Sequence, residues 1–330
     1  MTLVRILLTG SNGFVGGDLA SFLLRRGHSV VGLGRSREPG RAVSEYLRRD
    51  LGEPLDWDGT VDAVVHCAAL AAPWAPPSAF ERANVAGTRH VVEWCRGHGR
   101  PHLVYISSSS VFYRNEDQLG LHEGSPIPED REQINVYSRT KRIGERLVES
   151  YAGASAILRP RAVFGPGDRV LFPRVLRAAR AGRLPLIRRP DGRPVLGDLL
   201  YVENLSHYIG AVVERGVTGA LNLTNAEPVD LQAFLLRVLE RLGYPAPRRQ
   251  VPLGLAMALA GLSEWVSAVF LGYREPPVTR FGVSVFAYSK TFDVHRCLDL
   301  LGPPPISLAE GVERLAAAWQ REAVPAGGPP

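Results

Sequence analysis

Lysine is almost absent from this sequence. Of its 39 basic residues, only Lys141 and Lys290 are lysines, and all the others are arginines. Arginine stays protonated in proteins, so it cannot act as an ammonium group whose protonation is tuned near neutral pH. Any site in this chain that needs a titratable ammonium must therefore use one of these two lysines.

Cysteine is also scarce. The three cysteines, Cys67, Cys95 and Cys297, are an odd number without a C-x-x-C spacing. The chain also starts directly in an apolar run, 3–8, without the pattern of a signal peptide. We therefore expect reduced thiols in a cytoplasmic protein, no disulfide framework and no bound metal.

The chain lacks basic runs interleaved with aromatic residues, and it has no internal repeat. Its formal net charge of +6 comes from scattered arginines, so nucleic acid is not an expected partner. The composition is 45% hydrophobic and 22% charged, which is ordinary for a soluble enzyme. The 330 residues can form one large α/β domain with a smaller second lobe.

The first apolar run leads into a glycine-rich turn. The run 3–8 predicts a buried parallel strand, and a helix ending near Gly27 and a second strand, 30–33, follow the turn. This order is the context of a dinucleotide-binding fingerprint, although a plain strand-to-helix turn is the alternative. In that fingerprint the three glycines permit a tight turn, approach of a pyrophosphate and close helix packing. The predicted cofactor contacts in the turn are Gly10, Asn12, Gly13, Phe14, Val15 and Gly16.

The residues after the second strand bear on the choice of cofactor. Sites specific for NAD usually carry an acid here that binds the ribose hydroxyls. This strand instead ends in Gly34 and Arg35, with Arg37 two residues further and no acid before Glu38. Arg35 is placed to bind the 2′-phosphate of NADP through charge-assisted hydrogen bonds, and Gly34 leaves room for it. We predict that NADP is preferred over NAD; stacking of Arg35 on adenine, which tolerates either cofactor, is the alternative.

One of the two lysines follows a tyrosine by four residues. Tyr137 and Lys141 lie in a predicted helix that spans 135–148, and residues four apart share one face of a helix. An ammonium beside a phenol favours the phenolate and lowers its pKa. Such a tyrosine can exchange a proton with a ketone oxygen or an alcohol. The alternative is an unrelated surface pair.

Small and polar residues follow two later predicted strands. The strand 61–66 is followed by Cys67, Ala68 and Ala69, which let a ligand approach the carboxyl edge of a sheet. The strand 102–106 runs into a row of four serines, 107–110, which places hydroxyls beside the same crevice or merely caps the strand. We expect His66 to be buried at its strand end rather than catalytic.

These elements predict a Rossmann-type, doubly wound parallel sheet. We place the NAD(P)-binding domain in residues 1–165. A smaller substrate-binding lobe, interleaved with sheet elements, should lie mainly in 166–322, and 323–330 should be a disordered tail. Further helices are predicted at 170–181, 203–215 and 231–242.

The segment 252–272 is the most apolar stretch of the chain. Its length approaches that of a membrane span, but Glu264 and two glycines make it a poor one. We favour a helix that packs over an apolar substrate pocket. A plain core helix and a helix that contacts a membrane surface are the alternatives.

Together these motifs resemble the extended short-chain dehydrogenases/reductases, and the resemblance covers nearly the whole chain. The matching segments, in the expected order, are the glycine turn, Asp50-Leu51, the segment 66–69, Asn84-Val85-Ala86-Gly87-Thr88, the serine row, Tyr137-x-x-x-Lys141 and Leu158-Arg159-Pro160. The resemblance implies Ser108, Tyr137 and Lys141 as the catalytic residues, with Ser108 chosen because it precedes Val111 by three. It implies further cofactor contacts at Asp50, Leu51, Cys67, Ala68, Ala69, Tyr137, Lys141, Pro160 and Val163.

The C-terminal third resembles one branch of this family, the 3β-hydroxysteroid dehydrogenase-like enzymes and bacterial 3-oxoacid reductases. The similarity lies in 274–280 and 292–294. Nucleotide-sugar relatives carry Arg-Asp where this chain has Gly197-Asp198, so the phosphate-binding arginine is missing. The resemblance implies a homodimeric oxidoreductase that interconverts a ketone and a secondary alcohol on a small apolar substrate, steroid-like or long-chain 3-oxoacyl. The alternatives are a nucleotide-sugar epimerase or dehydratase with tightly bound NAD, and a non-catalytic NADP-binding regulator.

Overall fold

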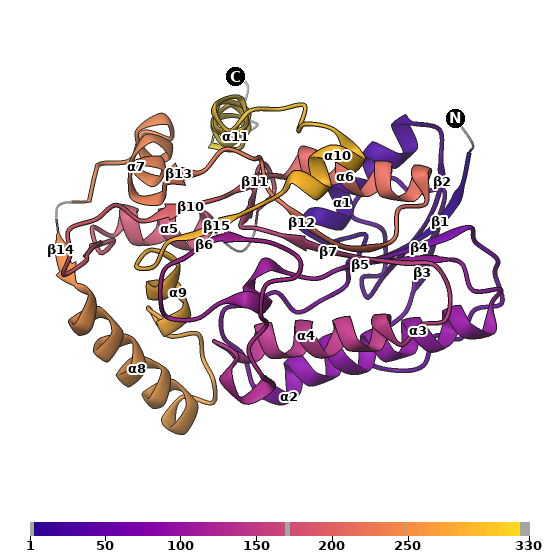
Figure 1. Cartoon of the computed structure of the whole chain (residues 1–330), viewed down its shortest axis with the longest axis horizontal. Helices are drawn as coiled ribbons and strands as arrows, with labels where there is room; N and C mark the ends of the chain where they lie inside the picture. The colour runs from indigo at the N-terminus through magenta and orange to yellow at the C-terminus, as the bar shows by residue number, and fades with distance from the viewer. Residues whose placement is uncertain (1–2, 169–171, 248, 324–330) are drawn as a thin grey trace, which may run out of the picture.

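A seven-stranded parallel sheet forms the centre of the molecule (Figure 1). The structure is a computed structural model that describes residues 3–168, 172–247 and 249–323, so the predicted tail lies almost wholly outside the described residues. The strands of the sheet are β1 (Arg5–Thr9), β2 (Ser29–Gly34), β3 (Glu45–Arg48), β4 (Ala63–His66), β5 (His102–Ile106), β7 (Ser155–Pro160) and β12 (Gly219–Leu223).

The strand order is β12-β7-β5-β4-β1-β2-β3, and all neighbouring strands run parallel. The order reverses between β1 and β4, which is the switch point where open α/β sheets bind ligands. Leu7 and Val64 at the centre are fully buried, because helices cover both faces of the sheet. The predicted Rossmann-type fold is confirmed.

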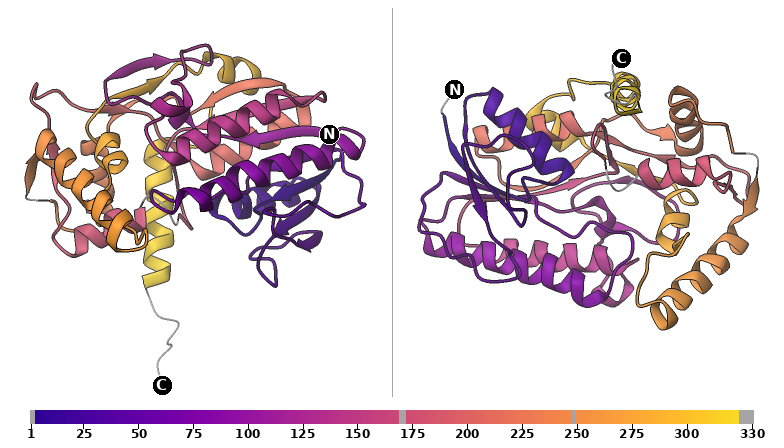
Figure 2. Two further views of the ribbon diagram at one scale, coloured as in Figure 1. Left: turned by 90° about the horizontal axis from the view of Figure 1, so that it is seen from below. Right: turned by 180° about the vertical axis from the view of Figure 1, so that it is seen from behind.

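Two pairs of helices cover the sheet. α1 (Phe14–Arg25) and α6 (Val202–Arg215) pack together on one face, and α3 (Gly87–Gly97) and α4 (Val136–Glu149) cover the other (Figure 2). A π-helical turn, Glu81–Ala86, joins α2 (Pro77–Phe80) to α3. The C-terminal helices α10 (His295–Leu301) and α11 (Leu308–Ala323) follow the last strand.

The smaller lobe is built around a second apolar core that includes Phe164, Phe172 and Phe234. Its helices are α5 (Phe172–Arg180), α7 (Leu231–Arg241), α8 (Leu253–Phe270) and α9 (Arg280–Val285). Its strands are β8 (Val163–Phe164), β9 (Leu186–Arg188), β10 (Leu196–Gly197), β11 (Leu200–Tyr201), β13 (Val229–Asp230), β14 (Gln250–Pro252) and β15 (Lys290–Phe292), together with β6 (Gln118–Leu121). The first residues of the helix predicted at 170–181 lie outside the described residues.

The two parts of the chain interleave, as predicted. β6 comes from the first part of the sequence and pairs with β15, whereas β12 comes from the second part and completes the central sheet. The division at residue 165 stays a prediction. The alternative of a plain core helix at 252–272 is excluded, because the outer face of α8 is exposed, with Leu259 at 50% and Trp265 at 55%.

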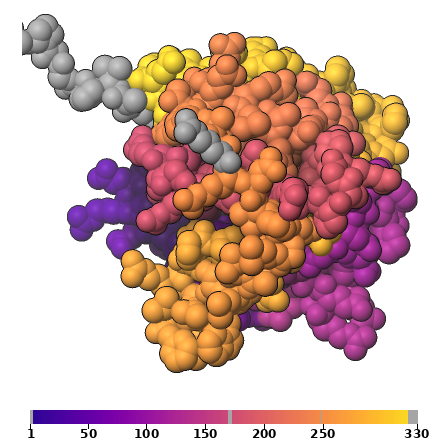
Figure 3. Space-filling view, turned by 90° about the vertical axis from the view of Figure 1, so that its left-hand side faces the viewer, coloured from indigo at the N-terminus to yellow at the C-terminus, as the bar shows by residue number. Residues whose placement is uncertain are grey.

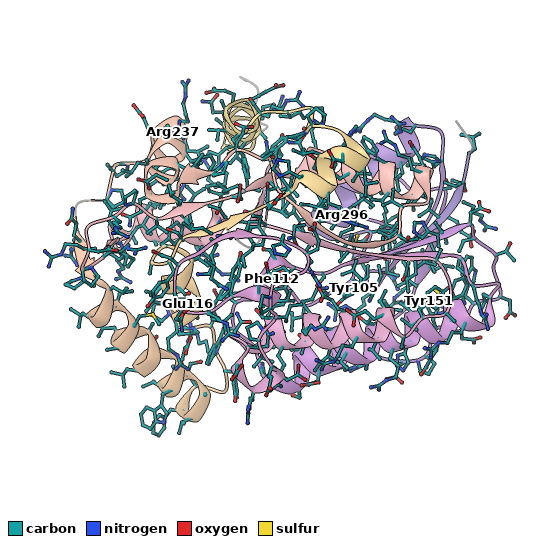
Figure 4. The ribbon with its side chains drawn as sticks, viewed as in Figure 1. Tyr105, Phe112, Glu116, Tyr151, Arg237 and Arg296 are labelled. Carbon is teal, nitrogen blue, oxygen red and sulfur yellow. The ribbon has the colours of Figure 1, made fainter. Side chains whose placement is uncertain are left out.

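A buried ion pair fixes α4 to the sheet. Glu145 of α4 accepts hydrogen bonds from Arg159 of β7 at 2.8 and 3.0 Å, and from the hydroxyl of Ser107 at 2.6 Å. The Arg159 guanidinium lies 4.8 Å from the centre of the Phe112 ring, which Figure 4 labels between the sheet and α4. Since this pair sets the height and rotation of α4, it also positions Tyr137, two turns away.

Removal of the Glu145 carboxylate should destabilise the fold strongly. Glu145→Ala leaves the Arg159 charge buried without its partner, which we expect to reduce the free energy of unfolding by about 3–5 kcal/mol. Urea unfolding measures the loss. Glu149→Ala is the control, because Glu149 lies one turn away on the same helix but is exposed and pairs only with Arg142 in the described structure. Equal losses in the two variants would contradict the assigned role.

Candidate active site

A cavity of about 270 Å³ opens beside the first turn of α4. Asn135 caps this helix, because its side chain accepts a hydrogen bond of 2.7 Å from the Ser138 N–H. The helix then presents Tyr137 to the cavity. Aromatic side chains, including Trp74, Phe80 and Phe281, form much of the remaining wall.

α8 closes one side of this cavity. Ala268 and Glu264 of α8 line it, and the Glu264 carboxylate accepts hydrogen bonds of 2.7 Å from the backbone and side chain of Arg280. The apolar segment therefore forms a helix beside a cavity, and the interpretation that this cavity holds an apolar substrate stays a prediction.

The four serines of the row differ in burial, with three buried and one partly exposed. Ser107, Ser109 and Ser110 are buried, and they bond to Glu145, the Tyr113 hydroxyl and Ser138 respectively. Ser108 is partly exposed, and a hydrogen bond from Ser108 lowers the pKa of Tyr137. Ser108, the serine that the family resemblance singles out, thus lies near enough to Tyr137 to affect its pKa, and its hydroxyl also lies 2.9 Å from that of Ser110.

The phenol of Tyr137 is held in its protonated form. Burial raises the pKa of Tyr137 to about 12, and the hydrogen bond with Ser108 offsets only part of that rise. The prediction that Lys141 lowers this pKa is not met by the structure. The Lys141 ammonium instead donates to the Ile106 carbonyl and lies 4.3 Å from the centre of the Tyr105 ring (Figure 4).

Lys141 is buried and titrates near neutral pH. Its side chain sits behind Tyr137 on α4, and burial lowers the pKa of the ammonium to about 7, while Cys67 and Glu145 oppose this shift. Few side chains change charge near neutral pH. Lys141 is therefore a titratable ammonium, which in this chain only a lysine could supply.

His66 is a neutral structural residue, as expected. Its Nδ1 lies 2.7 Å from the Thr9 hydroxyl, and its Nε2 lies 3.0 Å from the Thr88 hydroxyl. Since Thr88 donates its proton to the Asn84 carbonyl, the His66 Nε2–H must be the donor to Thr88. Burial lowers the pKa of His66 to about 3, so the ring stays uncharged.

The glycine turn forms a cradle that fits a dinucleotide pyrophosphate. Gly10 has φ of +73°, and a Cβ there would lie 2.8 Å from the Ala68 nitrogen. A Cβ at Gly16 would lie 2.2 Å from the Gly10 carbonyl oxygen, so the predicted tight turn and close helix packing are both found. α1 starts immediately after Gly13 and no side chain caps it in the described structure, so Phe14 and Val15 can offer their N–H groups to phosphate oxygens.

The loop after β2 differs from expectation at Gly34. A Cβ there would lie 2.8 Å from the Tyr46 hydroxyl, so Tyr46 fills the space that was expected for a phosphate. Asn12 bonds to Tyr46 and to the backbone of Glu38 and Gly40, and thereby orders this loop. Arg35 is exposed on the loop, where it remains free to reach a ligand.

Two neighbours of this loop were missed by sequence reasoning. They are Tyr46 and Arg41, whose side chain packs over Gly17 at the start of α1. Neither residue belongs to a sequence motif. Tyr46 lies in the short strand β3, and the loop that carries Arg41 has no regular periodicity. Only the folded loop brings them to the end of β2.

The remaining predicted cofactor residues follow the carboxyl ends of neighbouring strands. Cys67, Ala68 and Ala69 follow β4, Pro160 ends β7, and Val163 begins β8. Asp50 caps the Gly52 N–H at 2.9 Å and pairs with Arg82 at 3.1 Å, whereas Leu51 is buried in the core. These positions surround the switch point between β1 and β4.

Comparison with known proteins identifies the family. Residues 6–223 match the model of the NAD dependent epimerase/dehydratase family. The chain belongs to this family.

Several relatives of this epimerase/dehydratase family member are named as reductases or dehydrogenases. The chain is 32% identical to a 2-alkyl-3-oxoalkanoate reductase of Stenotrophomonas maltophilia, over 96% of this chain and 99% of the relative. It is 32% identical to 3beta-hydroxysteroid-dehydrogenase/decarboxylase isoform 1 of Arabidopsis thaliana, over 90% of this chain and 71% of that protein. The solved structure of MoeE5 in complex with UDP-glucose and NAD has a TM-score of 0.74 at 23% identity, covers 97% of this chain and 100% of its own, and shows the shared fold.

The low pKa of Lys141 predicts a pH-dependent stability. The folded protein binds this proton less tightly than the unfolded chain, whose lysine has a pKa near 10.5, so stability should rise with pH between about 7 and 10.5. Lys141→Met removes the buried charge. We expect it to be more stable than wild type in urea at pH 6, with the difference shrinking toward pH 9. A difference that is constant with pH, as expected for the control Arg139→Met, would contradict the assignment.

Proposed function

We propose that this protein is an NAD(P)-dependent oxidoreductase that reduces a ketone on an apolar substrate to a secondary alcohol. The observation that carries the proposal is the buried Tyr137 in the wall of an aromatic cavity, with Ser108 near enough to lower its pKa and Lys141 one turn further along the same helix. The names of two relatives, a 2-alkyl-3-oxoalkanoate reductase and a 3beta-hydroxysteroid-dehydrogenase/decarboxylase, agree with it.

The nicotinamide ring, when bound, supplies the hydride. Tyr137 gives its proton to the substrate oxygen, on which negative charge develops. The Ser108 hydroxyl donates a hydrogen bond to the same oxygen and holds it beside the phenol. Lys141 is placed to hold the ribose of the cofactor, and Trp74 and Phe80 keep water from the reacting atoms.

The protonation of Tyr137 favours reduction over oxidation. With a pKa of about 12, the phenol carries its proton at neutral pH and is ready to act as an acid. Oxidation of an alcohol needs the phenolate, which this environment disfavours. Activity in the oxidative direction should therefore grow with rising pH.

The substrate-side lobe favours an apolar molecule over a nucleotide sugar. A Cβ at Gly197 would lie 2.8 Å from Leu231, so an apolar side chain fills the position where nucleotide-sugar relatives carry arginine. The proposed substrates are long-chain 3-oxoacyl or steroid-like ketones, in agreement with the names of the relatives.

Tyr137→Phe tests the catalytic assignment. It removes the proton donor but keeps the ring, so kcat for ketone reduction should fall at least about 100-fold. Cofactor affinity, measured by quenching of tryptophan fluorescence, should change little. The matched control is Tyr273→Phe, which makes the same change in another wall residue of the cavity and should keep activity. Near-normal turnover by Tyr137→Phe would overturn the mechanism.

Cofactor preference depends on Arg35 in this proposal. An exposed guanidinium at the end of β2 can form paired hydrogen bonds with a 2′-phosphate, so NADPH should bind about tenfold more tightly than NADH. Arg35→Ala should weaken NADPH far more than NADH in calorimetric titrations. The control Arg89→Ala, an exposed arginine on α3, should affect neither. Equal affinities in wild type, or equal losses in the variant, would mean that Arg35 does not bind the phosphate.

We propose that the outer face of α8 docks on an anionic membrane surface. Within the described residues, α8 is the one helix long and apolar enough to cross a membrane, with a mean hydropathy of 1.6. Large apolar side chains are exposed along this helix and at the residue after it. They are Leu255, Leu259, Leu262, Trp265, Val269, Phe270 and, after the helix, Leu271. In Figure 3 this orange helix projects from the lower edge of the molecule.

Exposed arginines lie at both ends of this apolar face. Arg188 pairs across the strands with Pro252, the residue that precedes α8. Arg249 precedes β14, and Arg274 follows the helix. An apolar face between cations suits the interface of an anionic bilayer. The opposite face of α8 lines the Tyr137 cavity, so docking would bring the cavity close to membrane-dissolved substrates.

Sedimentation with vesicles tests the docking face. Wild type should bind vesicles that contain 30% phosphatidylglycerol and bind phosphatidylcholine alone more weakly. Trp265→Ser/Phe270→Ser should lose at least about tenfold in vesicle affinity. The control Leu119→Ser replaces a leucine of comparable exposure, 63%, far along the chain in β6. Unchanged binding of the double variant would exclude this surface, and loss of a dimer in light scattering would assign it to a second copy instead.

A further inference from the structure

A second cavity lies beyond the carboxyl end of β7 and contains a buried arginine. The side chain of Arg161 is only 3% exposed, and its Nε and Nη2 have no hydrogen-bond partner among the described residues. A buried guanidinium without acceptors is unfavourable. Its placement points to an acceptor that arrives with a ligand.

The nearest acid does not satisfy this arginine. Asp198 accepts the Phe292 N–H at 2.8 Å with Oδ2, while its Oδ1 has no partner in the described structure. Lys290, also buried, donates to the Glu116 carbonyl and adds a second cation. Two further carboxylates lie in this region: Asp117 is engaged by Arg189, and Glu116 is exposed. The cluster of Arg161, Lys290 and Asp198 therefore keeps an excess of positive charge.

The backbone and a ring hold Arg161 in place. Ala162, the next residue, has φ of +41°, which is unusual for a residue with a side chain. Strain of this kind persists where the surroundings impose it, and it is often found at functional sites. The guanidinium lies 5.3 Å from the centre of the Tyr113 ring, which supports its flat face and leaves its N–H edge for a ligand.

The cavity offers room for one small polar group. Its volume is about 30 Å³, close to that of one water molecule or one carboxylate. Its walls are apolar and include Phe172, Leu231 and Phe286, and Arg161 is the charged residue among the described residues that line it. A small anionic group at the end of an apolar molecule fits this combination.

One helix, α9, contributes to the walls of both cavities. Phe281 of α9 lines the Tyr137 cavity and Val285 of the same helix lines the Arg161 cavity. Residues four apart on a helix are separated by about 6 Å along its axis. In a 3-oxo acid the carboxylate carbon lies two bonds from the reacting carbon. That length, extended by one N–H···O hydrogen bond, is about the same distance.

We propose that Arg161 binds the carboxylate of the substrate and so selects 3-oxo and 3-hydroxy acids over neutral ketones and alcohols. This inference rests on the proposed function and adds a specificity-determining residue to it. The two free N–H groups would form paired, charge-assisted bonds with the carboxylate. The reacting oxygen would lie at Tyr137 and the apolar chain in the larger cavity.

Binding of a fatty acid and of its neutral ester tests the proposal without turnover. Wild type, titrated with dodecanoic acid and methyl dodecanoate in a calorimeter, should bind the acid about tenfold more tightly or better. Arg161→Met should lose that preference and leave ester affinity within about twofold. Arg161→Lys, which keeps the charge but not the paired geometry, should fall between the two. The control Arg296→Met changes an exposed arginine of α10, labelled in Figure 4.

Equal wild-type affinities for acid and ester would overturn the proposal. So would equal weakening of both by Arg161→Met, which is the result expected if Arg161 only shares a bridging water with Asp198. The variant Asp198→Asn separates these two cases further. If Arg161 binds the carboxylate of the ligand, removal of the Asp198 charge should strengthen binding of the acid. Weaker binding of the acid by this variant would contradict the proposal. If the proposed oxidoreductase function were wrong, the result would be different. Wild type would then bind the acid but would oxidise neither 3-hydroxydodecanoic acid nor its methyl ester.

Discussion

The buried ion pair between Glu145 and Arg159 is the contact on which the rest of the site depends. Two full charges are taken out of water to join α4 to strand β7 of the sheet, and the Ser107 hydroxyl also donates to the carboxylate. Such a pair contributes little net stability, but it tolerates only one placement of the helix. That placement sets Tyr137 at the aromatic cavity and Lys141 under the end of β5.

Burial also decides the chemistry of the site. The phenol of Tyr137 keeps its proton, since burial raises its pKa, whereas the ammonium of Lys141 has a lowered pKa for the same reason. Both shifts move these groups away from their charged forms. The resulting site is an acid poised beside an apolar pocket, which suits the delivery of a proton to an oxygen during reduction.

Much of this arrangement could be predicted from the sequence. The parallel sheet followed from short apolar runs with intervening helices. Tyr137 and the glycine turn followed from spacing, because local geometry fixes which residues share a helix face or a tight turn, whereas the choice of Ser108 came from the family resemblance. The direction of the Tyr137 pKa could not be predicted, since burial comes from Phe80 and other distant segments. Tyr46 against Gly34 and the unpartnered Arg161 were likewise hidden, because they depend on how the loops fold.

The central claim is that this site transfers hydride to a substrate and releases the reduced product, instead of returning hydride within each turnover as an epimerase does. The most direct test is the fate of deuterium from [4-²H]NADPH, of matched stereochemistry, during conversion of a long-chain 3-oxo ester. The account predicts one deuterium on the carbinol carbon of the product, with one NADP⁺ released for each alcohol formed. Product without deuterium, or an isomerised substrate with no net consumption of cofactor, would contradict it.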